Sequence, residues 1–420
     1  MLRSHSVSTK YLLFLLFFYT LLFNEILASA IPYFRYEDEL IALMAIPIWC
    51  EKRLKRMYNE RKLGVFPYIS GFLSLTIFGT LIYGYQTRME AILADIVLCS
   101  KFWLCIYSSK EIFHNFDIKK YSRGLYFHVK FVTRVYFILS VINVFYEIFP
   151  YYDYRYGIGT VRLFYSHPTV LQSCCSLLIV MIMGIHDYVE RPRIYVIMLI
   201  ITVLTTLRIR ALGNIVLLVA IYYFGIYQKR RITLKNLIFF IPLVILIGWD
   251  QIEYYFITLG MESARLQLVL KSFIIANEHF PFGAGFASFG SYYSAVFYSP
   301  VYYKYNLNNV YGMSKELSSF IGDSFWPMIL GQSGYVGLFL YIIAIYKLIK
   351  HISLLKSVSP CYHYSALGCM CYLIMDSTAE TAFVHPLSMP MAIWLGILIH
   401  YEKIWKLQSP QNDMIELECL

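Results

Sequence analysis

Apolar runs close to 20 residues long recur from one end of this 420-residue chain to the other. A helix of that length spans the hydrocarbon core of a bilayer, which is about 30 Å thick. Inside lipid the backbone has to satisfy its own hydrogen bonds, which leaves helices or closed β-barrels. The alternating segments of about ten residues that build a barrel are absent. The sequence therefore predicts an all-α polytopic membrane protein.

The composition supports the same prediction. Hydrophobic residues make up 59% of the chain and charged residues only 15%, too few charges for the surface of a soluble protein of this size. The net charge is +10, but the basic residues lie in short loops between apolar runs. That placement indicates membrane topology and no nucleic-acid partner. The 9 cysteines lie within or near the expected spans or at the end of the chain, which argues against a disulfide framework. The Cys174–Cys175 and Cys369/Cys371 pairs lack metal-site spacing, so we expect them to be small packing residues.

We expect about twelve spans. The first resembles a signal peptide, but its length and the spans that follow it favour a retained helix. The second and the ninth are short enough to be tilted, partly buried or re-entrant. The expected spans are Tyr11–Ala28, Leu40–Cys50, Val65–Gly84, Ala91–Tyr107, Phe131–Phe149, Pro168–Ile185, Ile194–Leu207, Ala211–Tyr227, Leu237–Trp249, Phe325–Tyr346, Ser365–Thr378 and Pro386–His400.

Basic residues fall in every second loop between these spans. One orientation places all the basic loops in the cytoplasm, and it also places both termini there. The long segment 250–323, between the ninth and tenth spans, then lies on the outer face as one large extracytoplasmic loop. We see no repeat or linker, so residues 1–420 are expected to form a single integral membrane domain.

Arg208 and Arg210 interrupt an almost continuous apolar stretch, in a turn predicted to face outward. Two arginines on that side run against the charge trend of the other outer loops. They could extend to the lipid head groups. They could also form an anion site, because the planar guanidinium suits phosphate oxygens.

The outer loop has several features of its own. The apolar period of Glu262–Glu278 predicts a helix on the membrane interface, with Arg265 as either a third phosphate ligand or an ordinary interfacial cation. Gly283 and Gly285 follow a proline and indicate a tight turn or close packing against a substrate. Tyrosines such as Tyr302, Tyr303 and Tyr311 have apolar faces and polar tips suited to sugars, or to an interfacial aromatic belt.

Acidic residues flank the last spans. Asp323 stands where the chain returns to the membrane, as either a helix cap or a base near the outer surface. Asp376 and Glu380 lie one turn apart near the outer face, and buried charges at such depths are paired or functional. Asp95, Lys101 and Arg134 are further charges predicted within spans.

In these places the sequence resembles the Wzy-type polysaccharide polymerases of the O-antigen polymerase and ligase superfamily. The similarity rests on the arginine-bearing turn Thr206–Gly213, on Arg265 followed by Phe280–Gly285, and on Asp323–Pro327 running into Gly331–Leu338. These segments occur in the family's order, and the topology is similar over nearly the whole chain. Ligases of the superfamily carry a histidine where this chain has Asp323, which favours a polymerase.

The resemblance implies a GT-C-like fold and a metal-independent glycosyltransferase without a cofactor, in the bacterial cytoplasmic membrane. Donor and acceptor would both be glycans on undecaprenyl diphosphate. The implied partners are membrane lipid, a flippase and chain-length regulator proteins. Arg208, Arg210, Arg265 and Asp323 would be catalytic, and Gly283, Gly285, Tyr302, Tyr303, Tyr311 and Glu380 would bind substrate. The alternatives are an O-antigen ligase-type transferase and a polysaccharide transporter or flippase.

Overall fold

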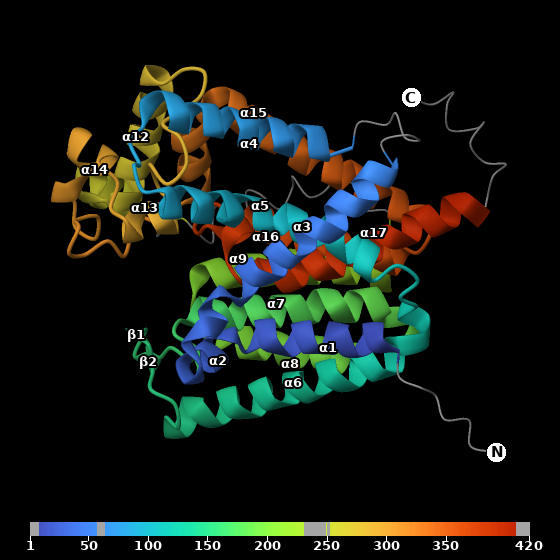
Figure 1. The fold of residues 1–420 in the computed structure, drawn as a ribbon. Coiled ribbons are helices and arrows are strands. Elements are labelled where there is room, and N and C mark those ends of the chain that lie inside the picture. The colour runs from blue at the N-terminus through green and yellow to red at the C-terminus, as the bar shows by residue number, and fades with distance from the viewer. Residues whose placement is uncertain (1–7, 57–63, 231–248, 250–252, 409–420) are drawn as a thin grey trace, which may run out of the picture.

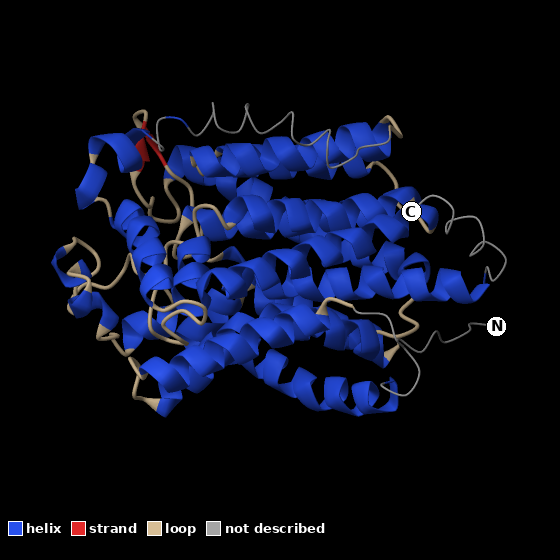
Figure 2. Ribbon diagram, turned by 90° about the horizontal axis from the view of Figure 1, so that it is seen from above, coloured by secondary structure: helices blue, strands red, loops and turns tan. Residues whose placement is uncertain are grey.

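The computed structural model describes residues 8–56, 64–230, 249 and 253–408 (Figure 1). It is 74% helical, and its strands are two residues long each. Most of the long helices run roughly along one common direction, and Figure 2 shows the same elongated bundle after a turn of 90°. The fold is therefore all-helical, as the apolar runs predicted.

The first half of the chain supplies most of the long helices. The elements are α1 (Thr9–Leu22), α2 (Asn24–Ala30), η1 (Pro32–Tyr36), α3 (Glu37–Arg56), α4 (Phe66–Tyr83), α5 (Met89–Ile112), α6 (Ile118–Tyr146), β1 (Tyr154–Arg155), β2 (Ile158–Gly159), α7 (Pro168–Ile185), η2 (His186–Tyr188), α8 (Pro192–Leu204), α9 (Ile209–Ala220) and η3 (Ile221–Tyr227).

The second half builds the outer loop and three further long helices. The elements are η4 (Glu253–Thr258), η5 (Gly260–Glu262), α12 (Ala264–Glu278), α13 (Tyr292–Val296), α14 (Val301–Lys304), η6 (Leu307–Asn309), α15 (Phe325–Leu354), η7 (Leu355–Ser357), α16 (Pro360–Asp376), η8 (Ala382–Val384) and α17 (Ser388–Gln408).

Five helices among the described residues are long and apolar enough to cross a membrane, which indicates a membrane-embedded protein. They are Phe66–Tyr83, Ile118–Tyr146, Pro168–Tyr188, Ile209–Tyr227 and Phe325–Ser357. A sixth is counted if α1 and α2, which meet at 75°, form one broken span. The total of twelve stays a prediction, and the ninth expected span, apart from Trp249, lies outside the described residues.

Helix α7 is the centre of the bundle, and it has the bounds that the sequence predicts for the sixth span. Pro168 occupies its first turn, where a missing N–H costs nothing, and His167 caps the helix by accepting from Thr169 N–H. Every residue of α7 is buried, because α6, α8, α9, α16 and α17 pack around it.

The bundle has two distinct ends. Helices α12, α13 and α14 lie at one end together with the β1–β2 hairpin, on the left in Figures 1 and 2. Helix α1 begins, and α17 ends, toward the opposite end (Figure 1). Arg208 at the start of α9 contacts Asp153 beside the β1–β2 hairpin, so the α8–α9 turn lies at the same end as α12, α13 and α14. The side of the membrane that this end faces stays a prediction.

A break in α15 attaches the outer loop to the bundle. Gly334 leaves the helical conformation (φ 66°, ψ −172°), which frees carbonyls in the turn before it. Gly331 O accepts from Ala284 N–H and Gln332 O from Gly285 N–H, both at 2.9 Å. Backbone groups freed inside a membrane need such partners, so the glycine segment completes the broken helix.

Helix α12 matches the predicted Glu262–Glu278 helix closely. Ser263 caps it, and Leu268 and Ile275 turn inward into a core that the outer loop builds for itself. Leu270, Phe273 and Ile274 remain exposed on another face. The helix therefore presents apolar side chains on two faces, one to the loop core and one outward, and an outward apolar face suits the membrane interface.

Candidate functional site

Three arginines from segments far apart in the sequence converge at the outer-loop end of the bundle. Arg208 and Arg210 come from the start of α9, and Arg265 comes from the first turn of α12. Their ion-pair partners bring four carboxylates with them. We call the group formed by Arg208, Arg210 and Arg265 with Asp153, Asp323, Asp376 and Glu380 the arginine cluster.

Arg210 joins α9 to the end of α16. Its Nη2 donates to Glu380 Oε1 at 2.5 Å, and its Nε lies 3.2 Å from Asp376 Oδ1. Asp376 also accepts from Asn214 Nδ2 at 3.0 Å, so the carboxylate has a neutral donor as well. Burial raises the pKa of Glu380, but the charge and hydrogen bond of Arg210, together with His385, hold that pKa below its ordinary value.

Arg208 faces the β1–β2 hairpin. Its Nη2 donates to Asp153 Oδ1 at 3.2 Å, and its guanidinium lies 5.0 Å from the centre of the Tyr152 ring. Burial raises the pKa of Asp153, yet the hydrogen bond from Thr160 and the charge of Arg208 hold it below its ordinary value. The Nε of Arg208 is buried and has no hydrogen-bond partner among the described residues. One donor of this side chain therefore lacks a hydrogen bond, as does the Nε of Arg210, which however lies 3.2 Å from Asp376.

Arg265 pairs with Asp323 through a contact of 3.6 Å between Nη2 and Oδ2. The same nitrogen reaches Ala379 O at 3.5 Å, and the guanidinium lies 4.6 Å from the centre of the Tyr255 ring. The arginine side chain is still 24% exposed. It is the most accessible cation of the cluster, because Arg208 and Arg210 are more deeply buried.

Asp323 occupies a partly dehydrated position. Burial raises the pKa of its carboxyl above the ordinary value, and the charge of Arg265 offsets that effect only in part. Asp323 is not the cap of α15. The N-cap residue of this helix is Ser324, whose side chain makes no capping hydrogen bond. A carboxylate with a raised pKa beside an arginine is suited to accept a proton.

His167 is a titratable neighbour that the sequence reasoning missed. Burial and, to a smaller extent, the charge of Arg208 together lower its pKa to about 4. Thr169 N–H donates to its Nδ1 at 3.2 Å, which places the ring proton of the neutral form on Nε2. Asp153 was missed as well. The sequence offered one indication of its role. Asp153 is an acidic residue in another loop that is predicted to lie on the outer side, where it could pair with the arginines of the α8–α9 turn.

The expected substrate residues separate into two groups. Glu380 belongs to the arginine cluster, whereas Gly283 and Gly285 pack against the bundle: a Cβ on Gly283 would lie 2.4 Å from Gly334 N, and one on Gly285 2.5 Å from Thr80 Cα. Both glycines have a positive φ, which agrees with the tight-turn interpretation, and their close contacts are with the protein backbone. Their contact with a substrate stays a prediction.

The tyrosines of the outer loop also differ from one another. Tyr302 is 0% exposed, and its hydroxyl is used by Gly290 N–H and Ser294, so the structure gives it a packing role in place of the expected sugar contact. Tyr303 and Tyr311 are exposed, and their rings contact other aromatic rings of the loop itself.

The other charges expected within spans are mostly paired. Lys101 forms a buried ion pair with Asp38 and lies 3.4 Å from Glu39. Asp95 is buried, and its Oδ2 accepts from Ala287 N–H at 2.6 Å and from Gln332 at 2.9 Å. These contacts hold α3 and the outer loop against α5. Arg134, by contrast, is exposed on α6.

One group among the described residues could hold a metal ion, away from the arginine cluster. It comprises His186, Asp187 and Cys361, whose ligand atoms lie within 4.8 Å of one another. Asp187 is exposed, and none of the three contributes to the arginine cluster.

Comparison with known proteins adds no family to this description. No model of a known protein family matches the sequence, and no curated protein matches it. The function therefore has to be argued from the arginine cluster itself.

Proposed function

We propose that the chain is a polysaccharide polymerase that joins oligosaccharide units carried on undecaprenyl diphosphate. One observation carries the proposal: Arg208, Arg210 and Arg265 converge with Asp323 at the outer-loop end of a membrane-embedded bundle. A cationic cluster beside a carboxylate of raised pKa suits a reaction that expels a diphosphate.

The proposed reaction is a direct glycosyl transfer. A hydroxyl oxygen of the acceptor glycan attacks the anomeric carbon of the donor, and the bond from that carbon to the diphosphate oxygen breaks. Asp323 accepts the hydroxyl proton, and the lipid diphosphate leaves with the electron pair. Negative charge grows on the leaving group, so guanidinium donors aimed at it stabilise the transition state.

The three arginines have different parts in this mechanism. Arg210 is held by two carboxylates and serves chiefly to fix the α9–α16 contact. Arg208 has a buried donor without a protein partner, and Arg265 is partly exposed, so these two bind the diphosphate. Glu380 orients Arg210 in this account and does not itself contact the sugar.

We further propose that this site faces the outside of a bacterial cytoplasmic membrane, with both termini in the cytoplasm. The basic loops that alternate along the sequence support this orientation. The partners would be lipid-linked donor and acceptor glycans, a flippase that delivers them, and proteins that regulate chain length.

The test replaces single arginines in the native cells. Arg208→Ala and Arg265→Ala should each abolish glycan lengthening while the protein stays in the membrane, and single units should accumulate on the lipid carrier. Arg134→Ala is the matched control, because Arg134 is exposed on α6 and its Nη2 donates only to Tyr195 among the described residues. Normal chain lengths in both cluster variants would exclude this mechanism. Accumulation of long glycans on the lipid carrier would identify a ligase.

A further inference from the structure

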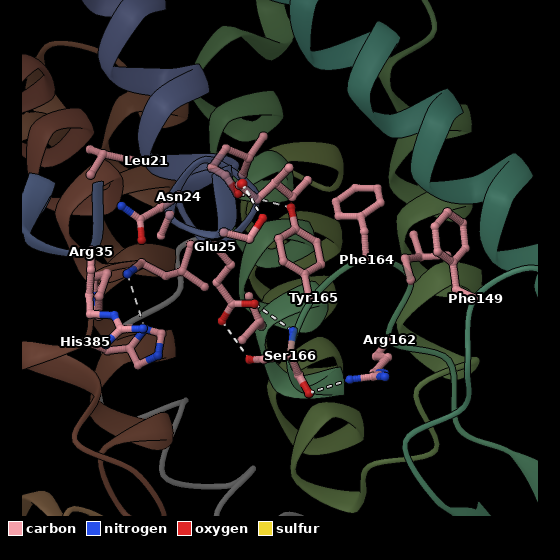
Figure 3. A pocket seen from close by; sticks show the side chains of 18 of the residues that line it. Leu21, Asn24, Glu25, Arg35, Phe149, Arg162, Phe164, Tyr165, Ser166 and His385 are labelled. Carbon is pink, nitrogen blue, oxygen red and sulfur yellow. Dashed lines mark hydrogen bonds between the residues drawn. The ribbon is translucent and has the colours of Figure 1, made fainter. Parts of the chain in front are cut away.

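A cavity of about 730 Å³ lies between three parts of the chain: α1 with α2 and η1, the segment that precedes α7, and the turn that precedes α17 (Figure 3). Ligand pockets in proteins commonly have volumes of about 300–1,000 Å³. Most of the wall is apolar, with Leu21, Ile26, Phe149, Leu163, Phe164 and Val170 among its residues. The proposed glycosyl transfer does not use this cavity.

Two arginines stand in this apolar wall. Arg162 donates through Nε to Pro150 O at 3.0 Å and through Nη1 to Ser166 O at 3.2 Å. Both acceptors are neutral carbonyls, which fix the guanidinium and leave its charge uncompensated. Arg35 lines the cavity from η1, and Figure 3 draws the two arginines on different sides of it. Neither has an ion-pair partner in the part of the chain that the structure describes.

The acidic residue of the wall, Glu25, offsets one of the two positive charges, so the wall keeps one excess positive charge. Glu25 accepts from Ser166 N–H at 2.7 Å and from the Ser166 hydroxyl at 2.8 Å, so both its oxygens are engaged (Figure 3). An anion that entered the cavity would therefore meet the fixed guanidinium of Arg162 and, from η1, the exposed side chain of Arg35. Guanidinium binds phosphate oxygens through paired hydrogen bonds, and the apolar wall suits a hydrocarbon chain.

The cavity lies next to the arginine cluster and is distinct from it. His385 lines the cavity and acts electrostatically on Glu380, and Ser166 in the wall is adjacent to His167, whose pKa responds to Arg208. Leu163 in the same wall has a positive φ of 53°. Such a conformation is unfavourable for leucine and persists where surrounding contacts demand it, frequently at binding sites.

We infer that this cavity binds a lipid with a phosphate head group. The phosphate lies between Arg35 and Arg162, and the first part of the hydrocarbon chain packs on the apolar wall. The volume holds a head group and the beginning of a chain, so the remainder extends into the bilayer. The inference does not depend on the glycosyl transfer proposed above.

The experiment is native mass spectrometry of the full-length protein in neutral detergent, titrated with one lipid at a time. The probes are undecaprenyl phosphate, phosphatidylglycerol and diacylglycerol, the last of which has no phosphate. We expect the protein to bind at least one of the phosphate lipids about tenfold or more tightly than diacylglycerol. A preference for undecaprenyl phosphate would identify the sugar-carrier lipid as the occupant, and a preference for phosphatidylglycerol the bulk lipid of the bilayer.

Two kinds of variant locate the binding. The double variant Arg35→Gln/Arg162→Gln removes the cations, and Ala28→Trp fills part of the cavity. Each should lower the affinity for the preferred lipid about tenfold or more. Arg134→Gln is the matched control and should bind as the wild type. Equal binding of diacylglycerol, or unchanged binding in both cavity variants, would overturn the inference. Arg208→Ala should keep this binding while losing glycan lengthening, which separates the two proposals.

Discussion

Replacing Arg210 with methionine tests the structural core of the arginine cluster. The substitution keeps a long apolar side chain and removes the charge that pairs with Asp376 and Glu380. Asp376 is only 4% exposed, so its carboxylate would stay buried without its cation. We expect the variant to be less stable because a buried charge then lacks a counter-charge.

The size of the effect follows from the burial of the pair. Breaking a buried ion pair by removing one partner costs about 3–5 kcal/mol. Glu380 is 28% exposed, so water screens part of its loss and the cost comes mainly from Asp376. With an unfolding entropy of about 2.1 cal/mol/K per residue over the 420 residues, the unfolding midpoint should fall by roughly 3–6 °C.

The assay is thermal unfolding of the full-length protein in detergent, followed by circular dichroism. The triple variant Arg210→Met/Asp376→Asn/Glu380→Gln removes all three charges and should recover at least about half of the loss, because replacing a whole buried network is often nearly neutral. Arg134→Gln should stay within about 0.5 kcal/mol of the wild type. The reasoning fails if Arg210→Met unfolds at the wild-type temperature, or if the triple variant is no more stable than the single one.

Three other predictions concern the base, the loop attachment and the topology. Because burial raises the pKa of Asp323 and a base must be deprotonated, the rate of glycan lengthening should decrease as the pH is lowered, and the decrease should set in above the pH of about 4 at which an ordinary aspartate titrates. A pH–rate profile that stays flat down to that value would exclude Asp323 as the base. Gly283→Ala should severely reduce the amount of folded protein, measured by size-exclusion chromatography in detergent. The new Cβ would clash with Gly334 and Gln332, and the φ of 74° at this position is unfavourable for alanine. A normal yield would contradict this packing. Tyr303→Cys should be labelled by an impermeant thiol reagent on intact cells, because Tyr303 is 52% exposed in the outer loop; labelling only after permeabilisation would reverse the proposed orientation.

Local signals in the sequence predicted the helices well. Pro168 sets the start of α7, and the basic loop after it sets the end, so the expected and observed bounds agree. The first expected span shows where local signals fail. Tyr11–Ala28 reads as one apolar run, yet it breaks at Phe23 into two helices. The cause is tertiary: Asn24 donates to Phe34 O at 2.7 Å, and Glu25 accepts from the segment before α7.

The candidate site also contains some residues that could be predicted from the sequence and others that could not. Arg208 and Arg210 could be recognised from the sequence as candidate site residues, because charged residues in an apolar stretch are costly and are usually paired or functional. Their partners could not be assigned, because ion pairs between distant segments depend on how the helices pack. Asp153 lies 55 residues from Arg208, and Asp323 lies in a different segment from Arg265. Tyr302 was predicted to bind sugar only because the loop is rich in tyrosine. In the structure its side chain is buried, so it is not exposed to a sugar.

The bend between α1 and α2 has a consequence for the bilayer around the protein. The 14 residues of α1 extend about 21 Å, whereas the hydrocarbon core is about 30 Å thick. One way in which a helix shorter than the core is accommodated is local thinning of the bilayer. The outer leaflet would then dip at α1, and its head groups would descend toward Arg35 in η1. The protein would in this way thin the bilayer around α1. A lipid could then enter the cavity laterally from the leaflet without leaving the membrane.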